Sequence, residues 1–111
     1  MSVCLMISNP VNQQEDDYYV PISCEREFEK YWQPIIDKLN LKWANFFQCG
    51  IEIEKMKFDE VIQELNEILK WVQNNMDNAQ GKRMEERIRN LCKELHSIYN
   101  SSRDDIKVFI G

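Results

Sequence analysis

The chain is poor in the residues that mark several large classes of protein. It has only three glycines, Gly50, Gly81 and Gly111, too few for a glycine-rich loop whose backbone amides cradle a phosphate group. It has a single histidine, His96, and its four cysteines form no C-x-x-C pair, so a zinc site has little support. We therefore predict neither a metal nor a cofactor.

Long apolar runs are absent as well. No stretch of about 18 apolar residues occurs, and the first residues show no basic segment followed by an apolar one. We expect neither a membrane span nor a secretory signal, and we predict a cytoplasmic protein. In that compartment the scattered Cys4, Cys24, Cys49 and Cys92 are interpreted mainly as small buried apolar side chains.

Basic residues are outnumbered. The chain has 19 Asp and Glu against 14 Lys and Arg, a net charge of −5. Residues 1–70 hold 13 of the acids and 7 of the bases, so the acidity lies in this part. An acidic protein is repelled by phosphate backbones and by anionic membranes. We expect no nucleic acid and no membrane as partner, and we predict a basic protein partner.

What the chain does have is enough apolar sequence for one domain. At 111 residues and 43% hydrophobic content, residues 1–111 are predicted to form a single domain. The clearest element is a helix over residues 58–76, whose apolar residues recur at spacings of three and four. These residues are Phe58, Val61, Ile62, Leu65, Ile68, Leu69, Val72 and Met76.

Other segments predict a small sheet and two more helices. A helix is expected from an N-cap at Ser23 to about residue 40, interrupted at Pro34 and ended by Asn40 in a left-handed conformation. A linker over 74–82 and a third helix over 83–99 follow. Apolar or alternating segments predict strands at residues 2–8, 18–22, 41–47, 50–54 and 106–110. The fold class is therefore α+β, with a small mixed or antiparallel sheet of about four to five strands packed against three helices.

Motifs with catalytic potential are weak. Cys92 and His96 stand four residues apart on one helix face, as a nucleophile and a base would. The pairs Glu60 with Glu64 and Glu52 with Glu54 are possible acid–base pairs, and residues 80–83 (QGKR) are a possible anion site before a helix. A structural or solvated role is the better interpretation of each, so we predict no catalytic residue and no enzymatic activity.

A second line runs along the 58–76 helix. Glu60, Glu64, Glu67 and Trp71 are spaced by four, three and four, so three carboxylates and a large aromatic ring share a line away from the apolar face. An aromatic residue among carboxylates is typical of a surface that binds a basic partner. We predict these four residues, together with the acidic run Glu15, Asp16 and Asp17, as partner-binding residues. The alternative for Trp71 is that it packs under a neighbouring strand or loop, as most tryptophans are buried.

Three segments carry a resemblance to a known group of proteins. They are FEKYWQPIIDKLNLKW (28–43), CGIEIEKMKFDEVIQELNEILKWV (49–72) and DIKVFIG (105–111). They resemble small single-domain immunity proteins of bacterial contact-dependent and polymorphic toxin systems. The resemblance implies a cytoplasmic, non-enzymatic protein that neutralises a cognate toxin domain, frequently a nuclease, by tight binding through an acidic surface. The alternative is a small helical adaptor or regulatory subunit that self-associates, with Trp71 in a symmetric interface.

Overall fold

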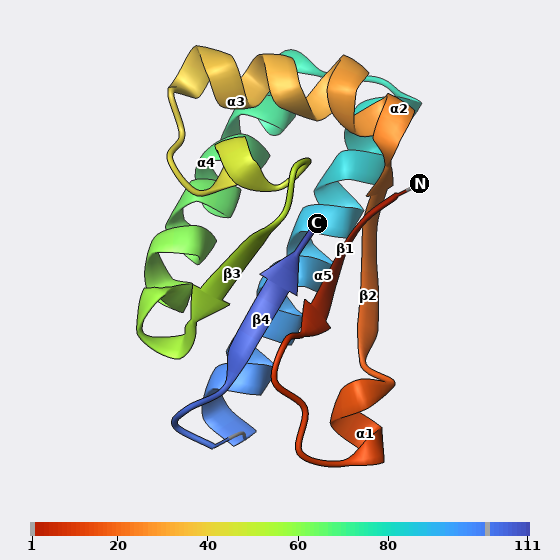
Figure 1. Ribbon diagram of the computed structural model, residues 1–111. Coiled ribbons are helices and arrows are strands. Elements are labelled where there is room, and N and C mark those ends of the chain that lie inside the picture. The colour runs from red at the N-terminus through yellow and green to blue at the C-terminus, as the bar shows by residue number, and fades with distance from the viewer. Residues whose placement is uncertain (1, 102) are drawn as a thin grey trace.

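The computed structural model describes residues 2–101 and 103–111 and shows a sheet backed by two long helices (Figure 1). The sheet has four antiparallel strands in the order β2-β1-β4-β3. Helices α4 (Phe58–Asn75) and α5 (Ala79–Ser101) cover one face of it, and α3 (Gln33–Leu39) lies across one end of the molecule. The strands are β1 (Ser2–Ile7), β2 (Tyr19–Cys24), β3 (Ile51–Glu54) and β4 (Lys107–Ile110). The prediction of an α+β fold is confirmed, and the sheet is antiparallel.

The core lies between the sheet and the two long helices. Leu5, Ile53 and Val108 point from three strands toward the helices and are completely buried. They meet the apolar face predicted for the 58–76 helix, on which Leu65 and Ile68 are also completely buried. β1 pairs with β2, and β4 lies inside the sheet between β1 and β3.

The opposite face of the sheet carries cross-strand rows of side chains. Cross-strand pairing puts Tyr19, Met6, Phe109 and Glu52 in one row across the four strands. The Phe109 ring lies so close to Gly50 that a Cβ there would approach its Cζ atom to 2.7 Å. Among the described residues, helices cover only one face of the sheet, although the strand β1 is apolar on both of its faces (Figure 1).

The segment between β2 and α3 is helical but irregular. α2 (Glu25–Glu27) begins at Glu25 rather than after Ser23, which belongs to β2 and donates its hydroxyl hydrogen bond to the Cys24 carbonyl. A π-helical stretch (Phe28–Trp32) comes next, and α3 starts one residue before Pro34. The π-helical stretch ends just before Pro34, whose nitrogen has no hydrogen to donate. The helix is therefore interrupted near Pro34, as the sequence predicts. Asn40 has φ 55° and caps α3 in the left-handed conformation, as predicted.

The predicted strand over residues 41–47 is wrong. Ala44–Phe46 form a short 3₁₀-helix, and Ala44 and Phe47, three residues apart, are both completely buried. The alternation of apolar residues that suggested a strand covers few residues. The Glu64 carboxylate of α4 instead bonds to the backbone amides at the start of the 3₁₀-helix. The predicted strand over 50–54 corresponds to β3.

α5 begins earlier than the predicted residue 83. The Asn78 side chain accepts a hydrogen bond from the Gly81 N–H at 2.8 Å, which caps the new helix. Gly81 lies in the first turn of α5, close to the backbone of Met76. A Cβ at this position would lie 2.3 Å from the Met76 carbonyl oxygen, so only glycine lets the helix pass Met76 at this distance. Tyr99, near the end of α5, is 44% exposed. Neither α4 nor α5, the long helices of the described chain, carries an apolar stretch able to cross a bilayer.

Candidate binding surface

Glu64, at the centre of the predicted acidic line, is occupied by the protein itself. Its carboxylate accepts hydrogen bonds from three successive backbone amides, those of Lys42 (3.1 Å), Trp43 (3.0 Å) and Ala44 (2.8 Å). These amides stand at the start of the 3₁₀-helix, where backbone N–H groups have no partner within the helix and the helix dipole favours negative charge. Glu64 therefore holds the 41–47 segment against α4 and has little capacity left for a partner.

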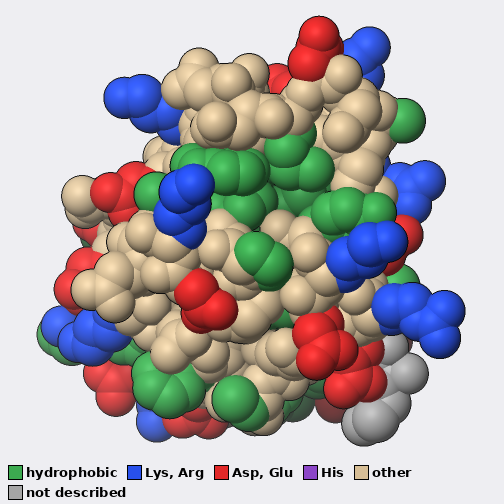
Figure 2. Space-filling model, turned by 90° about the horizontal axis from the view of Figure 1, so that it is seen from above, with side chains coloured by type: hydrophobic (Ala, Val, Ile, Leu, Met, Phe, Trp, Pro, Cys, Tyr) green, Lys and Arg blue, Asp and Glu red, His purple; other side chains and the backbone are tan. Residues whose placement is uncertain are grey.

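Trp71, at the end of the line, is not an exposed anchor. Its side chain is half buried and packs against the core. The Lys38 ammonium group of α3 lies 5.7 Å from the centre of its ring, within the range of a cation–π contact. Figure 2 views the end of the molecule that α3 crosses, and apolar side chains gather near the centre of this end with charged side chains beside and around them. Trp71 therefore contributes to a partner surface only through the part of its ring that remains exposed.

Glu60 and Glu67 are the two members of the line that remain exposed. They lie beside a shallow groove of roughly 350 Å³ between α4 and residues 39–43. The Glu60 carboxylate is 3.3 Å from the Lys57 ammonium group, but both side chains are about half exposed, so the pair is weak. Glu67 makes no ion pair within residues 2–101 and 103–111.

Two neighbouring residues, Asp59 and Trp43, border depressions beside Glu60 and Glu67, although the sequence analysis did not single them out. Asp59 is exposed and lines a second open depression of roughly 410 Å³, which Glu67 also borders. Trp43 lines the groove beside Glu60, and its indole N–H is buried without an acceptor. Asp59 directly precedes Glu60 in the sequence, so its place beside the acidic line could have been predicted. The place of Trp43 depends on the 3₁₀-helix, which the sequence did not predict. We define the α4 acidic surface as Asp59, Glu60 and Glu67.

The predicted run of Glu15, Asp16 and Asp17 is at a different place. It forms the end of α1 (Gln13–Asp16) and the residue after it, beyond β1 and β2 and far from the edge at which α4 lies (Figure 1). Glu15 accepts a hydrogen bond from the Arg103 guanidinium at 3.0 Å, and its side chain is only 19% exposed. Asp17 accepts one from the Gln13 amide at 2.9 Å, and Asp16 is exposed.

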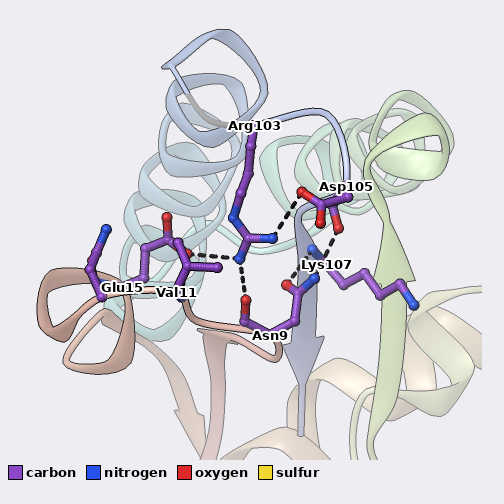
Figure 3. Close-up of polar contacts among 7 residues, drawn as sticks. Asn9, Val11, Glu15, Arg103, Asp105 and Lys107 are labelled. Carbon is purple, nitrogen blue, oxygen red and sulfur yellow. Dashed lines mark hydrogen bonds and ion pairs between the residues drawn. The ribbon is translucent and has the colours of Figure 1, made fainter.

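Arg103 joins this run to the connection between α5 and β4 (Figure 3). Its guanidinium donates to Glu15, to the Asn9 carbonyl and to Asp105 at 2.9 Å. The Asn9 side chain in turn accepts from the Lys107 N–H and donates to the Asp105 carbonyl, both at 2.9 Å. Glu15 therefore has a structural role, and the structure does not bring the two predicted acidic regions into one surface.

The possible catalytic pair lacks the features of an activated nucleophile. Burial raises the pKa of the Cys92 thiol to about 11, so the thiol stays protonated at neutral pH. His96 is exposed on the same helix. The structure shows four unpaired cysteines, of which Cys4 is buried, Cys92 is half buried, and Cys24 and Cys49 are exposed, so the expectation that most are buried is wrong.

The remaining candidate sites are the anion site at residues 80–83 and the pair Glu52 and Glu54. At residues 80–83, the Asn78 side chain accepts the hydrogen bond of the Gly81 N–H, and the Arg83 guanidinium pairs with Glu27 at 2.9 Å, so two of the groups that would bind an anion already have partners. Glu52 and Glu54 lie on the outer face of the sheet and are exposed. Within the described residues no three His, Cys, Asp or Glu side chains are grouped closely enough to hold a metal ion.

Comparison with known proteins does not assign the chain to a family. No family model matches the chain, and no curated protein and no solved structure does so either.

Proposed function

We propose that this chain is a non-enzymatic binding protein that neutralises a cognate bacterial toxin domain through the α4 acidic surface. The observation that supports the proposal is the exposure of Asp59, Glu60 and Glu67 beside two shallow depressions on one helix. The only base paired with this surface in the described chain is Lys57, through a half-exposed contact. Such a surface attracts a basic partner and repels nucleic acid.

A nuclease domain is the expected class of toxin. An enzyme that binds phosphate backbones presents a basic surface, to which the α4 acidic surface is electrostatically complementary. Occupying that surface blocks the approach of the nucleic acid without any chemistry in the inhibitor. The sequence resemblance to immunity proteins points to the same activity.

The test is binding to the toxin domain encoded by the neighbouring gene. We expect the wild-type chain to bind it tightly in calorimetry and to abolish its activity in a nuclease assay. The double variant Glu60→Lys/Glu67→Lys is expected to weaken binding at least tenfold, because it reverses two exposed charges without touching the Glu64 cap. A wild-type chain that does not bind or inhibit the toxin contradicts the proposal.

A matched control separates the local surface from net charge. Glu29→Lys/Glu86→Lys makes the same change in net charge at two exposed residues of other elements. We expect it to retain nearly wild-type affinity. Equal weakening by both double variants would mean that the α4 acidic surface is not the contact.

The alternative of a self-associating adaptor has less support. It places Trp71 in a symmetric interface, whereas that ring is partly buried against the core and the Lys38 ammonium group lies over it. Sedimentation at several protein concentrations distinguishes the two, because a dimer that persists without a partner favours the adaptor.

A further inference from the structure

The free edge of β3 has unpaired backbone groups whose direction can be worked out from the sheet. The Cys4 N–H donates to the Gly111 carbonyl and the Gly111 N–H to the Cys4 carbonyl, both at 3.0 Å. Alternate residues of a strand turn their backbone groups to opposite sides. Because Gly111 faces β1, Ile110 and Val108 are the residues of this segment whose backbone groups face β3.

In β3 the same alternation leaves one residue turned outward. Ile110 and Val108 pair with Ile51 and Ile53. Glu52 lies between these two, so its N–H and carbonyl point away from β4 to the edge of the sheet, where β3 is the last strand (Figure 1). Within the described chain no backbone group bonds to Glu52 from that side.

The other edge of the sheet is protected against an added strand. Cys4 faces β4, so Leu5 faces β2 and pairs with Val20. Pro21, the next residue, therefore turns its nitrogen to the outer edge, where it has no hydrogen to donate. A bulge in the pairing follows at once. Proline and bulges are common devices that prevent edge-to-edge pairing, and β3 has neither of them.

The side chains at the β3 edge define what can pair there. Glu52 and Glu54 are both exposed on the outer face of the sheet, whereas Ile53 between them is completely buried and fixes the strand. Lys107 neutralises this edge only weakly, because its ammonium group is 3.8 Å from Glu52 and both side chains remain 41% and 53% exposed. A second copy of the chain paired at this edge would place like charges in adjacent strands, which is unfavourable.

We propose that an extended segment of a basic protein partner, with Lys or Arg at alternate positions, adds to the free edge of β3. The backbone of Glu52 supplies the hydrogen bonds, and the carboxylates of Glu52 and Glu54 pair with the basic side chains on the same face. The added strand extends the row of Tyr19, Met6, Phe109 and Glu52 by one position. This inference rests on the proposed function only where it identifies the partner as a toxin domain. The basic charge of the added segment follows from the carboxylates of Glu52 and Glu54.

A synthetic peptide tests the edge directly. The probe is a peptide of about eight residues, the length of an ordinary strand, that alternates lysine with valine. A peptide with glutamate in place of lysine is the control. At saturating lysine peptide we expect hydrogen exchange of the Glu52 amide, followed by NMR, to slow at least tenfold, and the control peptide to leave it unchanged. Unchanged exchange with the lysine peptide, or equal slowing with the control, overturns the proposal.

Two variants separate the backbone from the charge. Glu52→Pro removes the outward N–H without removing a bond to β4, and it is expected to abolish peptide binding. Glu52→Thr keeps the N–H and removes the charge, so it is expected to bind several-fold more weakly and still protect the amide of residue 52. Equal binding by Glu52→Pro and wild type overturns the proposal. If Glu52→Pro does not fold, as judged by circular dichroism, the exchange measurement on the wild-type chain decides.

The outcomes distinguish this inference from the proposed function. If Glu52→Pro binds the toxin domain like wild type while Glu60→Lys/Glu67→Lys weakens binding, the strand addition is wrong and the inhibitory function stands. If no toxin domain binds but the lysine peptide protects the Glu52 amide, the function is wrong and the edge site stands. A dimer in sedimentation without peptide, with that amide already protected, identifies a second copy as the occupant and overturns the proposal.

Discussion

Glu64 shows how a single side chain changes role between sequence and structure. In the sequence it is the middle carboxylate of a line that includes Glu60 and Glu67. In the structure it caps the 3₁₀-helix Ala44–Phe46 through three backbone amides, more than twenty residues away at the farthest. Nothing local to Glu64 announces that contact, because its partners belong to a segment whose own conformation depends on the contact.

We expect Glu64→Ala to lower the free energy of unfolding by about 2 kcal/mol, the magnitude for losing a helix cap with charge-assisted hydrogen bonds. The measurement is urea unfolding followed by circular dichroism. Glu67→Ala, one turn along α4 and exposed, is the matched control and should change stability by less than about 0.5 kcal/mol. Similar losses for the two variants would show that the cap contributes little.

At the scale of elements, the long periodic helix and four of the five short strands were predictable, whereas the segment 41–47 and the start of α5 were not. α4 matches its prediction closely, because a buried face recurring over 18 residues leaves one interpretation. The strand predicted at 41–47 failed, since Leu41 and Trp43 alternate over too short a stretch to outweigh the Glu64 cap. The start of α5 failed for the opposite reason. Gly81 looks like a breaker, but it is needed where the helix passes Met76.

An ion pair in the connection between α5 and β4 makes the stability of the fold depend on pH in the acid range. The Asp105 carboxylate accepts a hydrogen bond from Arg103, which holds the pKa of Asp105 below its usual range. A carboxyl group whose pKa is lower in the folded state stabilises the fold above its unfolded pKa, and this stabilisation is lost as pH falls through the folded value. The loss belongs to the range below about pH 4.

We therefore expect Asp105→Asn to unfold at lower urea concentration than wild type at pH 6, with the difference shrinking below about pH 4. Urea unfolding at several pH values from 6 down to about 2.5 provides the measurement. Asp16→Asn, an exposed residue without an ion pair in the described part of the chain, serves as the control. A difference that stays constant over this pH range would mean that the charge of Asp105 does not contribute.

For the whole molecule, the sequence predicted the sign of the charge but not its distribution. The net charge of −5 favours a basic partner from composition alone. Folding then uses part of that acidity internally, in Glu15 with Arg103 and in Glu64 with backbone amides. It also brings Asp59, which the sequence analysis did not single out, and Glu67 to the borders of one depression. The exposed acid of the β3 edge depends on strand order, which composition does not contain.

The association rate with the toxin domain distinguishes the field of the whole molecule from the local surface. Glu60→Lys/Glu67→Lys and Glu29→Lys/Glu86→Lys change the net charge equally, from −5 to −1. If steering depends mainly on nearby charges, stopped-flow measurements at low salt should show the first variant associating about tenfold more slowly and the second only slightly more slowly. Above about 0.5 M salt, where screening removes steering, the rates should converge. Equal slowing at low salt would assign the steering to net charge.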